Sequence, residues 1–161
     1  MTGFTHFDGG GNAVMVDVGG KEGSEREARA EGRICMGAEC FAVLLGGGDF
    51  AKGDVLGVAR IAGIMAVKQT PFIIPLCHPL MITKVSVDFS FDDVACEVVA
   101  YCTVKTNGVT GVEMEALTGV SAALLTIYDM CKSMDRGMSL HGIRLLEKSG
   151  GKSGTWRADD A

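Results

Sequence analysis

The chain has 161 residues and a formal net charge of −5, which is about the size of a single domain. Hydrophobic residues make up 47% and charged residues 22%, the proportions of a globular protein rather than a disordered one. A run of about 18 apolar residues is absent, which excludes a membrane-spanning helix. The acidic balance argues against binding to nucleic acid through bulk positive charge.

The six cysteines include no pair with Cys-x-x-Cys spacing. The first residues lack the basic and apolar regions of a signal peptide. We therefore expect a cytoplasmic protein with reduced thiols, most of them small core residues. A regulator that uses these thiols or a bound metal is the alternative, but no second cluster of Cys and His has the spacing of a zinc site.

Glycine accounts for 23 residues, about twice its usual frequency. Residues 1–24 are glycine-rich and weakly patterned, so we expect a flexible N-terminal segment, or one that becomes ordered against a partner or ligand. Residues 25–153 are expected to form the core of the single domain 1–161, and residues 154–161 a tail.

Three elements are predicted in the first half of the core. Residues 26–36 alternate loosely, which favours a strand, although their Glu, Arg and Ala content also permits a helix. Residues 38–45 are apolar and end before three glycines, the pattern of a short helix. Residues 54–69 predict a longer helix that begins with Asp54 as N-cap and ends before Pro71.

The helix predicted over residues 54–69 is apolar almost all round, so we expect it to be deeply buried. Gly57 and Gly63 would let another backbone approach it closely.

The second half predicts a hairpin, a helix and a strand. Residues 84–92 and 96–104 alternate cleanly around a turn, as in an antiparallel hairpin with one solvent-exposed face. Residues 112–134 carry an apolar stripe at helical spacing, and residues 139–147 form a last strand. The order predicts an α+β fold: a ferredoxin-like sandwich, an antiparallel sheet with helices on one face plus one extra helix.

Cations gather in two stretches of this acidic chain. Residues 52–84 hold four cations and one acid, and residues 132–152 hold five cations and two acids. Such clusters suit a polyanionic small molecule, although solvated surface lysines are the simpler interpretation. The sequence KSGGKSG at 148–154 lacks the spacing of a Walker motif, but its amides and lysines could surround a phosphate.

Three further groups could carry chemistry. The prolines of Pro75-Leu76-Cys77-His78-Pro79 make a stiff loop that could hold His78 for ligand recognition or proton transfer; a structural turn is the alternative. Glu113 and Glu115 begin the long helix about 200° apart, so they should not share one helical face. Asp129 and Lys132 are neighbours at i, i+3, either a surface ion pair or, with a partly buried lysine, a proton-transfer pair.

Several long stretches together resemble one family: RIAGIMAVKQ, IPLCHPLMITKV, TGVEMEALTGVSAALLTIYDMCK and RLLEKSGGKSG. They are similar to the signature segments of cyclic pyranopterin monophosphate synthase, the MoaC-type protein of molybdenum cofactor biosynthesis. The resemblance runs from about residue 5 to residue 154. It implies the ferredoxin-like fold.

The resemblance also implies a lyase reaction. The family converts (8S)-3′,8-cyclo-7,8-dihydro-GTP to cyclic pyranopterin monophosphate and releases pyrophosphate. No redox step occurs, so the protein itself requires no cofactor, and Mg²⁺ would come only with the substrate triphosphate. A ferredoxin-like module that binds a purine nucleotide without turnover is the competing hypothesis.

Site residues follow from the resemblance position by position. The catalytic positions are matched by Asp129, Lys132 and Lys52. The substrate-contacting positions are matched by Leu76, Cys77, His78, Met114 and Glu115, with Glu113 nearby. Basic positions suited to the triphosphate are matched by Arg26, Lys68, Lys148 and Lys152.

The family assembles as a hexamer, a trimer of dimers, with active sites between subunits. The apolar character of residues 54–69 suits such an interface. Two positions depart from the family pattern, because Val109 and Gln69 stand where cations are usual, which removes positive charge near the expected site.

Overall fold

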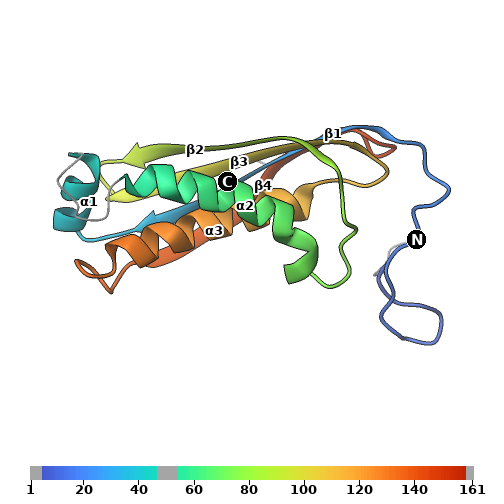
Figure 1. The fold of residues 1–161 in the computed structure, drawn as a ribbon, viewed down its shortest axis with the longest axis horizontal. Coiled ribbons are helices and arrows are strands. Elements are labelled where there is room, and N and C mark those ends of the chain that lie inside the picture. Colours follow the sequence, from blue (N-terminus) through green and yellow to red (C-terminus); the bar gives the residue numbers. More distant parts are fainter. Residues whose placement is uncertain (1–4, 47–53, 159–161) are drawn as a thin grey trace.

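The computed structural model describes residues 5–46 and 54–158, arranged as Figure 1 shows. In chain order the elements are β1 (Ser24–Cys35), α1 (Ala38–Leu45), α2 (Val55–Ile73), β2 (Ile82–Asp92), β3 (Glu97–Gly108), α3 (Glu113–Cys131), β4 (Ser139–Ser149) and β5 (Trp156–Arg157). The strand predicted over residues 26–36 is confirmed against the alternative of a helix, and so is the short helix α1.

The strands form one antiparallel sheet in the order β2-β3-β1-β4-β5, and α2 and α3 cover one of its faces (Figure 1). The first four strands have the connectivity of the ferredoxin-like sandwich, so the α+β prediction is confirmed. Alternate residues of β1 and β3 are buried beneath the helices, as the alternating pattern predicted. They include Ala28, Ala30, Ile34, Val98, Ala100, Cys102 and Val104.

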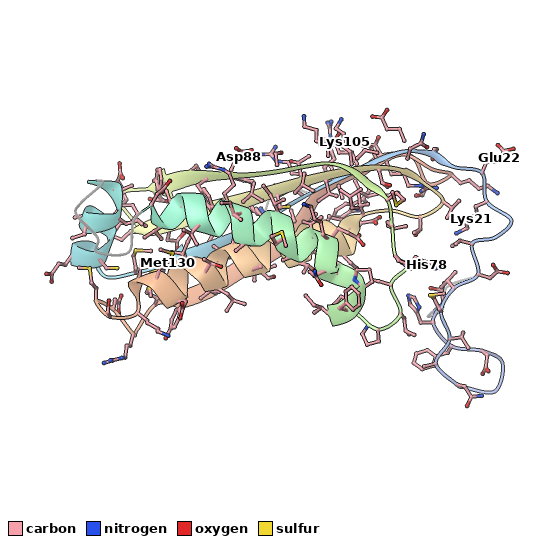
Figure 2. The ribbon with its side chains drawn as sticks, in the orientation of Figure 1. Lys21, Glu22, His78, Asp88, Lys105 and Met130 are labelled. Atoms are coloured by element: carbon pink, nitrogen blue, oxygen red, sulfur yellow. The ribbon has the colours of Figure 1, made fainter. Side chains whose placement is uncertain are left out.

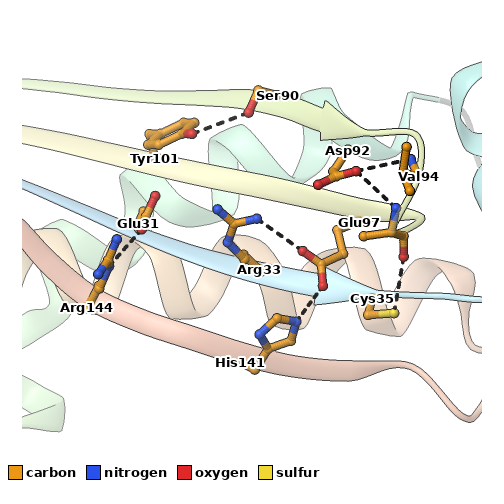
Figure 3. Close-up of polar contacts among 11 residues, drawn as sticks. Glu31, Arg33, Cys35, Ser90, Asp92, Val94, Glu97, Tyr101, His141 and Arg144 are labelled. Atoms are coloured by element: carbon orange, nitrogen blue, oxygen red, sulfur yellow. Dashed lines mark hydrogen bonds and ion pairs between the residues drawn. The ribbon is translucent and has the colours of Figure 1, made fainter. Parts of the chain in front are cut away.

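The opposite sheet face carries ion pairs instead of a second layer of helices (Figure 3). The carboxylate of Glu97 lies 3.2 Å from Arg33 and 2.9 Å from the ring nitrogen of His141. Arg144 donates to Glu31 at 2.8 Å, although Glu31 is only 6% exposed. This face therefore satisfies its charges within the sheet.

Two glycines allow α2 and α3 to cross closely over the sheet. A Cβ atom on Gly63 would lie 2.9 Å from the carbonyl oxygen of Gly119, closer than real Cβ atoms come. A Cβ atom on Gly119 would lie 2.6 Å from the sulfur of Cys102 on β3. The close approach expected at Gly63 is thus present. Gly57 serves another purpose, because its space is taken by the carboxylate of Asp54, which caps α2 by accepting from the Gly57 amide at 2.9 Å.

The predicted end of α2 before Pro71 is wrong, because the helix continues to Ile73 with the proline inside it. Proline has no amide hydrogen to donate to the carbonyl of Val67, four residues earlier. The hydroxyl of Thr70 donates to that carbonyl instead, at 3.0 Å, and Thr70 is fully buried. The side chain replaces the lost backbone bond, so the helix is not broken.

The expectation that α2 is buried all round is also wrong. One side packs on α3 and the sheet, but the other leaves large apolar side chains exposed at helical spacing: Val58, Ile61, Met65 and Phe72. The residues taken for a tail are partly sheet, because β5 pairs with Glu147 and Lys148 of β4. None of the helices in the described part of the chain is long and apolar enough to cross a lipid bilayer.

All six cysteines lie in the described residues and are free thiols. Cys40, Cys102 and Cys131 are buried, and the other three are half-buried. Half of the thiols therefore occupy core positions, and Cys102 directly contacts the helix crossing.

We expect Gly119→Ala to lower the free energy of unfolding by about 1–2 kcal/mol, because overpacking at the crossing outweighs the better helix propensity of alanine. Urea unfolding measures the change. Gly20→Ala is the matched control, since nothing lies within 4 Å of a Cβ atom there. Equal stability of the two variants would contradict the close crossing.

Candidate functional site

A cavity of about 350 Å³ lies where the N-terminus of α3 meets the α2–β2 loop and the N-terminal segment. The α2–β2 loop contributes Leu76, Cys77, His78 and Leu80. The start of α3 and the residues before it contribute Thr110, Gly111, Glu113, Met114 and Glu115. The N-terminal segment contributes Thr5, His6, Val16, Val18 and Lys21. Six residues matched through the resemblance are therefore brought together.

Both glutamates line this cavity, although they do not share one helical face. The cavity wraps around the end of α3, so opposite sides of the first turn reach it. Gly111 makes this possible, because a Cβ atom there would overlap the carboxylate of Glu113, which folds back over it. Glu115 is only 3% exposed; burial raises its pKa, and the negative charge of Glu113 adds to the shift.

The α2–β2 loop is held by the N-terminal segment. The Nε2 atom of His78 lies 2.8 Å from the carbonyl oxygen of Val16, so this nitrogen donates and carries the proton. Burial raises the pKa of the Cys77 thiol, with a further contribution from Glu115. Cys77 is thus a neutral thiol at neutral pH, suited to contact a ligand rather than to attack it.

A larger groove of about 730 Å³ lies beside this cavity and shares Lys21 and Thr110 with it. Three cations line the groove, Lys21, Arg26 and Lys152, against the single acid Glu22. Figure 2 shows Lys21 and His78 at the same end of the molecule, on the N-terminal segment and the α2–β2 loop. A cavity with two carboxylates therefore opens beside a groove with three cations.

Arg26 holds the groove together. Its Nε donates to the carbonyl of Gly108 at 2.8 Å, and its terminal nitrogen donates to that of Val109 at 3.1 Å. Gly151 lies against the same guanidinium with a φ of +71°, and a Cβ atom there would overlap it. One side chain of β1 thus joins the end of β3 to the loop after β4, while its charge faces the groove.

Two other basic positions, Lys148 and Lys68, do not line the groove. Lys148 is on β4 and donates to the hydroxyl of Ser153, which braces the loop that carries Lys152. Lys68 lies on α2 and lines two further hollows, of about 150 and 360 Å³, the first of which it shares with Glu115. Lys68 therefore lies near Glu115 but does not line the cationic groove.

The pair Asp129 and Lys132 lies at the other end of α3. The Nζ atom of Lys132 lies 2.6 Å from the carboxylate of Asp129, and 52% and 68% of the two side chains are exposed. Within one chain they form the surface ion pair rather than the alternative with a partly buried lysine. Lys132 follows Glu115 by 17 residues, which at about 1.5 Å per residue is about 25 Å along the helix. Figure 2 shows Met130, near this end of α3, and His78, beside the cavity, at opposite ends of the helical layer. Lys52 lies outside the described residues.

The MoaC family model matches residues 15–151, most of the chain. The match spans β1 to β4 and most of the residues that line the cavity and the groove; Thr5, His6, Lys152 and Ser153 lie outside it. The chain belongs to the MoaC family. This is the family of cyclic pyranopterin monophosphate synthases, so the protein has a role in molybdenum cofactor biosynthesis. The matched residues include every site position inferred from the resemblance except Lys152, which follows directly.

Lys21 is a candidate site residue of this MoaC-family chain that sequence reasoning missed. It follows Gly19-Gly20 in a stretch with no periodicity, which gave no element on which to place it. The available signal was its position within the resemblance, five residues before Arg26. The structure places it where the cavity and the groove meet.

Within residues 5–46 and 54–158, no three side chains of His, Cys, Asp or Glu come together as metal ligands. The groove could instead receive a metal ion with a phosphate ligand, because Mg²⁺ is commonly held by substrate phosphates and one or two carboxylates.

We expect Glu115→Gln to raise the free energy of unfolding at neutral pH and to have little effect near pH 4. Above the unfolded value of 4.5 the unfolded chain loses its proton before the folded chain does, so wild-type stability falls as the pH rises to the raised folded pKa. The gain should be about 1.4 kcal/mol for each unit by which folding raises this pKa. Urea unfolding at several pH values measures it, and a gain that does not change with pH would contradict the assigned burial cost.

Proposed function

We propose that this chain converts (8S)-3′,8-cyclo-7,8-dihydro-GTP to cyclic pyranopterin monophosphate with release of pyrophosphate. Membership of the MoaC family over residues 15–151 carries the proposal. The geometry supports it, because a guanine-derived ring has N–H groups that need acceptors and a triphosphate needs cations. The cavity supplies the carboxylates of Glu113 and Glu115, and the adjoining groove supplies the cations.

In this proposal the groove binds the triphosphate. Lys21, Arg26 and Lys152 line it directly. Lys148 braces the loop of Lys152, and the amides of Gly150 and Gly151 add donors to the same loop. The carbonyl, not the side chain, of Val109 faces Arg26, so losing the family's usual cation there leaves the Arg26 contacts in place. Magnesium would enter with the phosphates.

The ring lies in the cavity against the α2–β2 loop. Leu76, Cys77 and Met114 provide apolar and thiol contacts, and Glu113 and Glu115 accept from the ring N–H groups. Burial of Glu115 strengthens its charge-assisted hydrogen bonds, because the local dielectric is low. The raised pKa of the Glu115 carboxyl then makes binding sensitive to its ionisation.

The reaction requires proton transfers, which we assign to Lys132 with Asp129 as its orienting partner and Lys52 as a second lysine. The purine ring opens, the pterin ring closes, and a sugar hydroxyl attacks the α-phosphorus. Pyrophosphate leaves as the cyclic phosphodiester forms. An amine in contact with a carboxylate can give and take the protons of these steps.

Lys132 lies about 25 Å from Glu115 along a rigid helix, so one chain cannot bring both to the same substrate. We therefore propose a composite site, in which the cavity of one subunit receives Asp129 and Lys132 of another. The exposure of the pair in one chain is what such a site needs. We propose that the chain forms a homo-hexamer, a trimer of dimers, in the cytoplasm. The exposed apolar side of α2 offers a contact surface for such an assembly.

We expect Lys132→Ala to lower turnover at least about 100-fold while the protein stays folded, because general acid–base catalysis contributes that much or more. Release of pyrophosphate and formation of a fluorescent pterin measure turnover. Lys105→Ala, on the ion-paired sheet face, is the matched lysine control. An active, folded Lys132→Ala protein would overturn the role assigned to Lys132. Wild-type protein that binds the cyclised substrate but releases no pyrophosphate would favour the competing hypothesis of a nucleotide-binding module.

The composite site predicts complementation between two inactive variants. Co-expressed Lys132→Ala and His78→Ala chains should recover about a quarter of wild-type activity, because mixed pairs contain one site with both residues intact. Each variant purified alone should remain inactive. No recovery in mixed oligomers, confirmed by differently tagged chains, would contradict a site built from two subunits.

A further inference from the structure

The N-terminal segment of the protein is a structured wall of the cavity rather than a loose strand. Its fold is local: the carboxylate of Asp8 accepts from the amides of Gly10 and Asn12 at 2.9 and 2.8 Å, and Phe7 pairs with Ala13. Gly11 closes the turn with a φ of +82°. These bonds make a small hairpin that needs no contact with the sheet.

Two hydrogen bonds fix the position of the hairpin relative to the cavity. The amide of Val14 donates to the carbonyl of His6 at 3.0 Å, and two residues later the carbonyl of Val16 meets the Nε2 atom of His78. The hairpin therefore places His6 opposite Val14, close to the point where the segment is bonded to the α2–β2 loop. His6, Val16 and His78 all line the same cavity.

The three histidines of the chain differ in what their rings bond. His78 donates to Val16, and His141 bonds Glu97 on the far sheet face. Within the described ranges, the imidazole of His6 has no hydrogen-bond partner, and it is exposed to the cavity. Its ring nitrogens are available to a ligand.

A guanine-derived edge presents N–H groups beside a carbonyl oxygen, so it needs a donor as well as acceptors. The two carboxylates of the cavity accept from N–H groups but cannot donate to a carbonyl when ionised. Among the other lining side chains, Thr5, His6 and Thr110 can donate, and Lys21 can donate but also lines the cationic groove. The Nε2 proton of His78 is already used by Val16.

We propose that His6 is a further substrate-contacting residue, whose imidazole donates to the carbonyl edge of the guanine-derived ring held by Glu113 and Glu115. This inference rests on the proposed function for the identity of the ring. It assigns the N-terminal hairpin the task of delivering that donor. His6 binds the ring and takes no part in the proton transfers.

Two measurements test the assignment. His6→Ala should raise KM for the cyclised substrate about tenfold and leave kcat within about twofold, as expected for loss of one ligand hydrogen bond. His6→Gln keeps a donor and should recover part of the loss. His141→Ala is the matched control and should match wild type, because Glu97 keeps its bond to Arg33. An unchanged KM for His6→Ala would overturn the proposal.

The second measurement does not depend on turnover. Only three histidines are present, so ¹³C-histidine labelling gives three ring signals that single-site variants assign. Guanosine and GTP should both shift the His6 signal, whereas inorganic triphosphate alone should not, and His141 should stay in place. A His6 signal unmoved by guanosine and GTP would overturn the assignment. Inactive wild-type protein with a guanosine-shifted His6 would overturn the proposed lyase function alone.

Discussion

The arrangement of the site depends on one constraint, which is that α3 is long and rigid. The helix crosses the sheet without a break, with Glu113 and Glu115 at its start and Asp129 and Lys132 at its end. Its contacts with α2 at the two glycines and with β1 at Gly32 leave no freedom to bend. The carboxylates at the start of α3 and the amine at its end are therefore fixed at a distance that no rotamer change can close. Under the proposed function, a second copy of the chain is needed to complete each reaction centre.

The cavity and the cationic groove are assembled largely from segments that have little secondary structure of their own. Arg26 joins the end of β3 to the loop after β4 through backbone carbonyls, and His78 joins the α2–β2 loop to the N-terminal segment. In both cases one long polar side chain bonds the main chain of a distant segment. The ligand surface is thus rigid where the helices and strands end, which suits recognition of a large, polar substrate.

Most of the fold could be predicted from the sequence, because periodicity records which side of each element is buried. The alternation in β1 to β3 and the stripe in α3 gave the elements and, through their order, the sheet topology. The end of α2 was predicted wrongly because the rule for proline ignores a hydroxyl at the preceding position, and Thr70 supplies one. β5 was missed because two residues carry no pattern. The apolar character of α2 was expected to suit an interface, but composition does not say which side of the helix is left exposed for a partner.

The candidate site was less accessible to such reasoning. The loop with His78 and the two glutamates of α3 were singled out from the sequence, and the resemblance matched them to substrate-contacting positions. Their meeting in one cavity needed the structure, since over 30 residues separate them. Lys21 and His6 lie in a segment without periodicity, so only the folded structure gives them a place. The separation of Lys132 from Glu115 could have been calculated from helix length alone once both were placed on α3.

Arg60 of α2 covers part of one edge of the sheet. Its Nε donates at 2.8 Å to the carbonyl of Val87 in β2, the outermost strand on that side of the sheet. A strand from another molecule that paired with β2 at this point would have to displace the guanidinium of Arg60. The contact therefore opposes edge-to-edge aggregation of the sheet.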